Sequence, residues 1–127
     1  MTGTDDICRD VWDTTEFVAI VTNGQDGPHV TGTWGEYVRQ LAPSAQTIVI
    51  PAGGYRQTGE NLANDARITL LIASRQVWGS QGPGQGCRIA GTAELVTEGP
   101  TVEEVKRKFP WARAALVVSV EETVTQL

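Results

Sequence analysis

Short runs of apolar and β-branched residues recur along the chain, and each run predicts a β-strand. The run from Phe17 to Thr22 stops at a turn, residues 23–28, whose two glycines can adopt positive φ. The segment from His29 to Trp34 is therefore expected to be its antiparallel partner. Further strands are predicted at Thr47–Ile50, Ile68–Val77, Arg88–Val96 and Ala114–Val120.

Helices are predicted in three places. Residues 5–14 place apolar side chains on one face and charges on the other, a second helix covers residues 59–64, and a third begins near Gly99. Thr58 is expected to cap the second helix, because its hydroxyl can accept a hydrogen bond from a free backbone N–H. The whole pattern predicts one mainly β (α+β) domain over residues 1–127, an antiparallel barrel with helices packed outside.

Size and charge narrow the function classes. The chain has 127 residues and a mass of 13.7 kDa, enough for one domain with its own core. Its net charge of −5 argues against binding to nucleic acid or to anionic membranes. The longest apolar run, residues 68–73, is too short to cross a bilayer, and residues 1–6 do not resemble a secretion signal. We therefore expect a cytoplasmic protein.

The cysteine and histidine content limits the chemistry. Cys8 and Cys87 lie far apart in the sequence, so two reduced, partly buried thiols are expected. His29 is the only histidine, which excludes a Cys/His zinc set, and no Gly-x-Ser-x-Gly nucleophile motif accompanies it. No metal site and no catalytic residue of the chain's own are predicted. Any reactive group is expected to belong to a bound cofactor.

The segment from Pro51 to Thr58 carries the clearest chemical signal. Gly53 and Gly54 follow a strand and let a ligand approach the main-chain N–H groups, since no Cβ stands in the way. A guanidinium, an amide and a hydroxyl follow at the start of a helix, which together form a seat for a phosphate. On spacing alone, a plain turn before a capped helix is the more common explanation. Trp34 and Trp111, at strand ends, could flank a flat ligand.

Several motifs in one order resemble the small FMN-binding proteins of the split-barrel superfamily, which includes pyridoxamine-phosphate oxidase and flavin reductases. The resemblance extends from about Phe17 to Leu127 and is much more specific than any one of its parts. The motifs are Asp26-Gly27-Pro28-His29, Thr33-Trp34, Pro51-x-Gly53-Gly54, Gly82-Pro83-Gly84-x-Gly86 and Trp111-Ala112-Arg113-Ala114-Ala115-Leu116-Val117.

The resemblance implies a six-stranded antiparallel split β-barrel that forms a homodimer and binds one FMN per subunit near the interface. It implies that Pro51, Ala52, Gly53 and Gly54 offer main-chain donors to the flavin ring. It also implies that Arg56, Gln57 and Thr58 bind the phosphate. Thr33, Trp34 and Trp111 are expected beside the flavin ring. Leu127 is expected to approach the flavin of the partner subunit.

Three positions depart from the pattern of those proteins. Gln57 stands where they have lysine, which removes one charge that would meet a phosphate, and the adjacent Arg56 is the candidate replacement. Gly32 stands in place of an asparagine, and Thr15 in place of a glutamate near the flavin. These departures bear on cofactor affinity and redox tuning more than on the fold.

The sequence thus predicts a cytoplasmic FMN-binding protein that transfers electrons to an unknown redox partner or acts as a minimal flavin-dependent oxidoreductase. Pyridoxamine-phosphate oxidase activity is disfavoured, because no second basic cluster is present to hold a substrate phosphate. Two alternatives remain open. One is another planar cofactor, a deazaflavin or haem, and the other is a cofactor-free dimeric interaction module.

Overall fold

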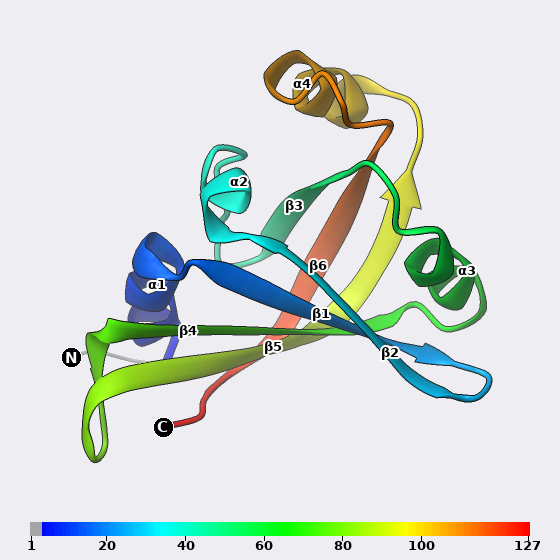
Figure 1. The fold of residues 1–127 in the computed structure, drawn as a ribbon. Helices are drawn as coiled ribbons and strands as arrows, with labels where there is room; N and C mark the ends of the chain where they lie inside the picture. Colours follow the sequence, from blue (N-terminus) through cyan, green and yellow to red (C-terminus); the bar gives the residue numbers. More distant parts are fainter. Residues whose placement is uncertain (1–3) are drawn as a thin grey trace.

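A computed structural model describes residues 4–127 of the chain. Residues 1–6 are the segment that was expected not to be a secretion signal, and Met1 to Gly3 of this segment lie outside the described residues. Six antiparallel strands form one strongly curled sheet in the order β2-β1-β4-β5-β6-β3 (Figure 1). Their bounds are β1 Phe17–Gly24, β2 Gly27–Trp34, β3 Thr47–Ala52, β4 Arg67–Gly79, β5 Gly82–Val96 and β6 Ala114–Thr125.

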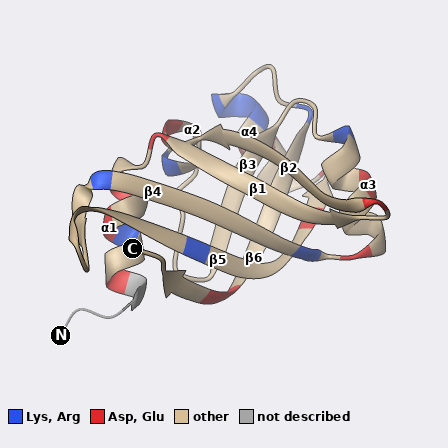
Figure 2. Ribbon diagram, turned by 60° about the horizontal axis from the view of Figure 1, so that its bottom comes forward, with Lys and Arg blue, Asp and Glu red and all other residues tan. Residues whose placement is uncertain are grey.

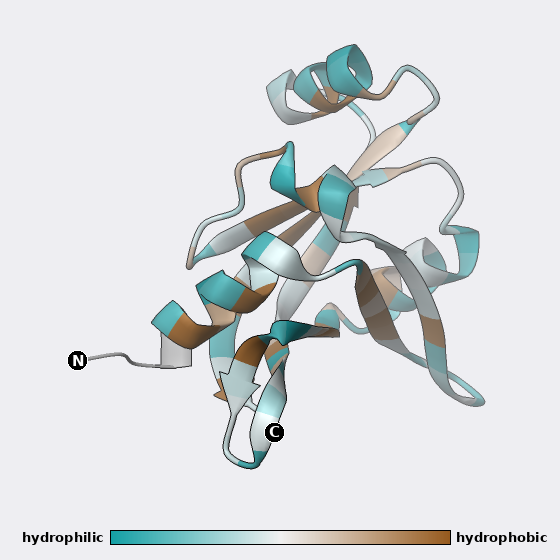
Figure 3. Ribbon diagram, turned by 60° about the vertical axis from the view of Figure 1, so that its left-hand side comes forward, coloured by the Kyte–Doolittle hydropathy of each residue, from teal (hydrophilic) through white to brown (hydrophobic). Residues whose placement is uncertain are grey.

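Alternation along the strands builds the core. In β1, every second residue from Val18 to Thr22 is buried, and the inner faces of β3, β4 and β6 add further branched aliphatic side chains. Figure 3 shows these apolar stretches as brown bands along the strands. The sheet bends at a register shift between β5 and β6 beside Gly91, where a Cβ would lie 2.0 Å from the carbonyl oxygen of Ser119.

Helices α1 (Thr4–Thr14), α2 (Gly35–Arg39), α3 (Arg56–Asn64) and α4 (Pro100–Lys108) lie around the sheet. The sequence missed α2, which is too short to show a periodic pattern. The prediction that Thr58 caps α3 is wrong. The helix begins at Arg56 behind Tyr55, whose φ is 60°, so Thr58 already lies inside the first turn. None of the described helices combines the length and apolarity needed to cross a bilayer.

The barrel is split between β2 and β3, the two edge strands of the sheet. The chain leaving β3 spans this split, because the phenol of Tyr55 donates a hydrogen bond to the carbonyl oxygen of Gly32 on β2 at 2.8 Å. The predicted six-stranded antiparallel split barrel is therefore confirmed.

The expectation of two free thiols is wrong. Helix α1 packs across the sheet, and its Cys8 forms a disulfide with Cys87 of β5 at a Cα–Cα distance of 5.8 Å. Both residues are buried. The 79-residue separation gave no sign of this pairing, because the apolar face of α1 is what brings the two residues together.

Candidate functional site

The turn formed by Gly53 and Gly54 has its carbonyl groups occupied and its amides free. The guanidinium of Arg113 donates through Nε to the carbonyl oxygen of Gly53 at 2.7 Å and through Nη2 to that of Gly54. The backbone N–H of Arg113 donates to Ala52 at 2.9 Å, which fixes the start of β6 against the end of β3. Among the described residues, no backbone carbonyl accepts from the amides of Gly53 or Gly54. These two N–H groups can therefore donate to a ligand.

An aromatic cluster covers one side of this turn. The indole of Trp111 lies 5.7 Å from the ring of Tyr37 on α2 and 5.6 Å from that of Phe109. A Cβ at Gly53 would approach the Trp111 indole to 3.2 Å, so glycine permits this close contact. Trp111 is half exposed and presents a flat apolar surface beside the free amides.

The N-terminal turn of α3 contains a buried polar atom without a partner. Thr58 is 0% exposed, and within the described part of the chain its hydroxyl has no hydrogen-bond partner. The first backbone bond of the helix runs from Gly59 to Tyr55, so the preceding N–H groups have no helical acceptor. The first turn contains no acidic residue, and Arg56 is exposed beside it. This combination of free donors and positive charge suits an anion.

Gln57 is turned away from that N-terminus. Its side-chain amide donates to Oδ1 of Asn61 at 2.8 Å, and the amide of Asn61 donates in turn to Oγ1 of Thr22 at 3.1 Å. Asn61 and Thr22 are both buried. These hydrogen bonds hold α3 against the β1–β2 hairpin, so the side chain of Gln57 has a structural role. The exposed Arg56 is therefore the cation available to an anion at the N-terminus of the helix.

Tyr55 links the turn to β2 beside Thr33. Burial raises the pKa of the Tyr55 phenol above its ordinary value, and a hydrogen bond with Thr33 partly opposes that rise. The phenol therefore stays protonated and remains a donor to Gly32. The space beside Gly32 is filled by the ring of Phe17, since a Cβ there would lie only 2.0 Å from that ring. Glycine at this position accommodates Phe17.

Most predicted site residues meet at the split of the barrel. The two glycines, the start of α3, Thr33 and Trp111 surround one region at the ends of β2 and β3. Pro51 and Ala52 are buried and pair with Ala115 and Ala114 of β6, so they position the turn from within the sheet. Trp34 follows Thr33 directly, and its half-exposed indole lies 5.9 Å from the ring of Phe17.

Leu127 does not join this region within one chain. Its N–H donates to Oε1 of Gln85 at 2.8 Å, and its carbonyl accepts from Ser80 at 3.2 Å. The C-terminus therefore lies along the β4–β5 hairpin, at the end of the sheet away from α3 (Figure 1).

Sequence reasoning missed three residues that shape the site: Tyr55, Asn61 and Arg113. Arg113 lies inside a motif that carried the resemblance, and its charge beside Trp111 was the available signal. Asn61 follows Gln57 by one helical turn, which is the spacing for a side-chain pair. No sequence signal marked the left-handed conformation of Tyr55.

Comparisons with known proteins show the family of the chain. A family model described as "Pyridoxamine 5'-phosphate oxidase" matches residues 4–126. An "FMN-binding protein" from Nitratidesulfovibrio vulgaris (strain DSM 19637 / Miyazaki F) is 47% identical over 103 residues, which cover 81% of this chain and 82% of that protein.

Solved structures share the fold. A variant of HupZ from Group A Streptococcus superposes with a TM-score of 0.74 at 19% identity, covering 99% of this chain and 100% of that one. A crystal structure of an FMN-binding protein from Syntrophomonas wolfei subsp. wolfei gives a TM-score of 0.68 at 12% identity, covering 98% of this chain and 86% of that one. At these identities the matches show a common fold.

Proposed function

The chain belongs to the pyridoxamine 5'-phosphate oxidase family, and on that basis we propose that it is an FMN-binding protein whose cofactor lies at the split of the barrel. The buried, unpartnered hydroxyl of Thr58 is the observation that carries the proposal. An unsatisfied buried hydroxyl costs about 1–3 kcal/mol, and an FMN phosphate would satisfy it. The residues around it fit the rest of that cofactor.

The proposal assigns separate binding roles to the residues that face the cofactor. Thr58 and the free N–H groups of the first turn of α3 donate to the phosphate, and Arg56 supplies the positive charge. The amides of Gly53 and Gly54 donate to acceptors at the edge of the flavin ring, while Arg113 keeps their carbonyl groups turned away. Trp111 and Trp34 shield the ring from water, beside Thr33.

Bound FMN would supply the redox chemistry, since its ring can accept and return electrons. We propose electron transfer, or a simple flavin-dependent oxidoreductase activity, with a redox partner still to be identified. The amides of Gly53 and Gly54 would favour electron density at the ring edge they face, and would raise the reduction potential. The chain itself contributes binding, orientation and electrostatics.

We further propose a homodimer formed through the outer face of the sheet. The outward residues of β1, β2 and β4 include the half-exposed side chains of Phe17, Trp34 and Leu71 and the exposed Val30. Figure 2 shows few charged residues on these strands, while much of the charge lies on the helices. A contiguous apolar face of this kind is typical of an interface between subunits. A second copy could place its Leu127 near the flavin.

Replacing Thr58 with valine is expected to weaken FMN binding by about tenfold to a hundredfold, because a charge-assisted hydrogen bond to the phosphate is lost. The cofactor-free protein should be as stable as the wild type or slightly more stable, since an unsatisfied hydroxyl is removed. Titration of FMN into stripped protein measures the first effect, and thermal unfolding measures the second. Unchanged affinity would place the phosphate elsewhere.

The emission of FMN is expected to be largely quenched on binding, because an excited flavin readily takes an electron from a nearby indole. The Trp111→Leu variant should recover part of that emission, whereas Trp78→Leu, at the exposed end of the β4–β5 hairpin, should not. Steady-state fluorescence at saturating protein tests this. Full emission from bound FMN in the wild type contradicts the placement beside Trp111.

The Leu71→Asp variant is expected to be monomeric, because Leu71 is 45% exposed on the β4 side of the proposed interface and a carboxylate there would be desolvated on association. Thr101→Asp on α4 introduces the same charge away from this face and should remain dimeric. Sedimentation velocity gives both masses. A wild-type monomer, or a dimeric Leu71→Asp variant, would rule out this interface.

The identity of the chromophore separates FMN from the alternatives. Acid release from the purified protein, followed by absorbance and mass measurement, distinguishes FMN from a deazaflavin or haem. A protein that takes up neither FMN nor FAD in titration would instead support a cofactor-free interaction module.

A further inference from the structure

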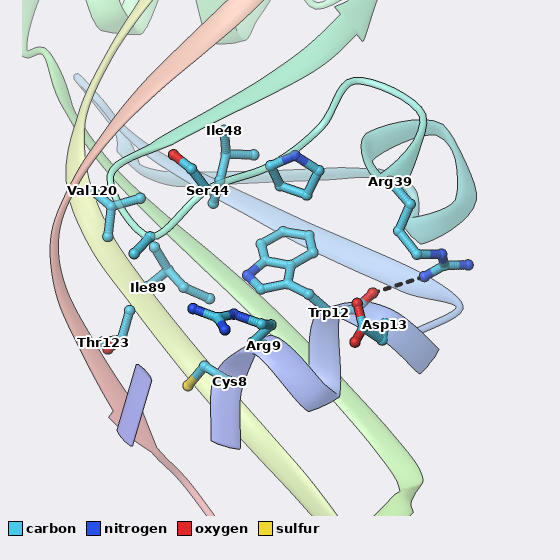
Figure 4. A pocket seen from close by; sticks show the side chains of 12 residues that line it. Cys8, Arg9, Trp12, Asp13, Arg39, Ser44, Ile48, Ile89, Val120 and Thr123 are labelled. Atoms are coloured by element: carbon cyan, nitrogen blue, oxygen red, sulfur yellow. Dashed lines mark hydrogen bonds between the residues drawn. The ribbon is translucent and has the colours of Figure 1, made fainter. Parts of the chain in front are cut away.

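A cavity lies outside the proposed flavin site. It has a volume of about 440 Å³ and lies between α1, the loop of residues 43–45 and the inner side of the sheet (Figure 4). This size is within the range of small-molecule sites. Its walls include Ile48 of β3, Ile89 of β5 and Val120 of β6, and the indole of Trp12 projects into its middle. No residue of the flavin site lines it.

Trp12 presents its indole N–H to this cavity. Its side chain is only 8% exposed, yet no described residue accepts a hydrogen bond from the indole N–H. Figure 4 shows the nitrogen edge of the indole turned towards the same part of the cavity as the guanidinium of Arg9. This N–H can therefore donate a hydrogen bond to an acceptor that enters the cavity.

The rim of the cavity is positively charged. Arg9 and Arg39 line it together with one carboxylate, Asp13. No ion pair joins either arginine to a described acidic residue. Arg39 is held in place because its Nη1 donates to the carbonyl oxygens of Trp12 at 2.9 Å and Thr15 at 2.7 Å. Arg9 is exposed, and its guanidinium is the free cation at the rim.

The walls are fixed before any ligand arrives. The disulfide between Cys8 and Cys87 ties α1 to β5 directly under the cavity. Across from it, the hydroxyl of Ser44 accepts from the backbone N–H of Thr47 at 3.0 Å and so closes the loop that forms the rim. A preformed cavity of this kind loses little conformational entropy on binding.

We propose that this cavity binds a small aromatic carboxylate. The ring would pack between Trp12 and the aliphatic side chains, and the carboxylate would accept from the indole N–H of Trp12 and from the guanidinium of Arg9. Apolar walls select the ring, and the positive rim selects the anion. This site does not depend on FMN, because the two sets of residues share no member.

Calorimetric titration with 2-naphthoate tests the proposal, using the protein as purified and again after saturation with FMN. Binding is expected in both cases. The affinity should fall about tenfold in Arg9→Gln and about fivefold in Trp12→Phe. Arg107→Gln, the same change of charge on α4, should bind like the wild type. The neutral analogue 2-naphthamide should bind more weakly than the carboxylate.

Any of the following results would overturn the proposal: no binding of 2-naphthoate, equal binding of 2-naphthamide, or binding that Arg9→Gln leaves unchanged. The indole N–H resonance of Trp12 in ¹⁵N-labelled wild-type protein provides a direct readout. It is assigned by its loss in Trp12→Phe, or by selective labelling if that variant does not fold. This resonance should shift on addition of 2-naphthoate, and a static signal would also count against the site.

Discussion

Replacing Gly54 with valine is expected to lower the affinity for FMN by at least about a hundredfold while leaving the fold intact. A Cβ at Gly54 would meet no atom within 4 Å, and its φ lies outside the left-handed range, so the chain tolerates a side chain there. The branched side chain would instead cover the free amides of Gly53 and Gly54, which are the proposed donors to the flavin ring. Blocking two hydrogen bonds and the close approach of a ring accounts for this size of effect.

The contrast with Gly53→Ala makes this test specific. A methyl group at Gly53 would lie 3.2 Å from the Trp111 indole, so it should displace the indole and lower the thermal stability as well as the affinity. For Gly54→Val only the affinity should change. Isothermal titration with FMN and thermal unfolding of the stripped proteins distinguish the two. Wild-type affinity in Gly54→Val would mean that the cofactor approaches from another side.

Removing the disulfide is expected to lower the free energy of unfolding by about 2–5 kcal/mol, because the bond closes a loop of 79 residues and restricts the unfolded chain. For a domain of this size, that corresponds to a fall in Tm of about 10 °C or more. The Cys8→Ala/Cys87→Ala double variant should show this loss in thermal unfolding. Its affinity for FMN should stay close to that of the wild type, because neither cysteine lies in the proposed flavin site.

Reduction supplies the control for the disulfide. Wild-type protein treated with dithiothreitol under denaturing conditions and then refolded with the reductant should match the double variant in Tm. Each single variant should already lose most of the stabilisation, since one alanine is enough to break the bond. If thiol alkylation and mass measurement find two free thiols in the oxidised protein, the predicted loss does not apply and the pairing is wrong.

Much of the fold could be predicted because the strands have strong patterns. The apolar, β-branched run from Phe17 to Thr22 and the glycine-containing turn after it identify the β1–β2 hairpin, and the structure pairs these strands in register from Phe17↔Trp34 to Gly24↔Gly27. The order of the sheet was not readable from the same pattern. It depends on β3 pairing with β6, a contact between segments far apart in the chain.

The site was predicted in part, for a similar reason. Local features such as the two glycines and the start of α3 are visible in the sequence. The disulfide, the hold of Arg113 on the turn and the contact of Tyr55 with Gly32 all arise when distant strands meet, and no local spacing encodes them. The mistaken cap at Thr58 has a local cause, since the helix begins behind the left-handed Tyr55, three residues earlier than predicted.

The pairing of β3 with β6 has a consequence during synthesis of the protein. Arg113 follows Gly53 and Gly54 by about 60 residues in the sequence. In the nascent chain, the turn therefore lacks its hydrogen bonds to Arg113 until the last strand has emerged from the ribosome. The disulfide partner Cys87 is translated well before that point. If the chain binds FMN as proposed, uptake of the cofactor is expected to be the final step of maturation, and a chain that stalls before β6 should remain colourless.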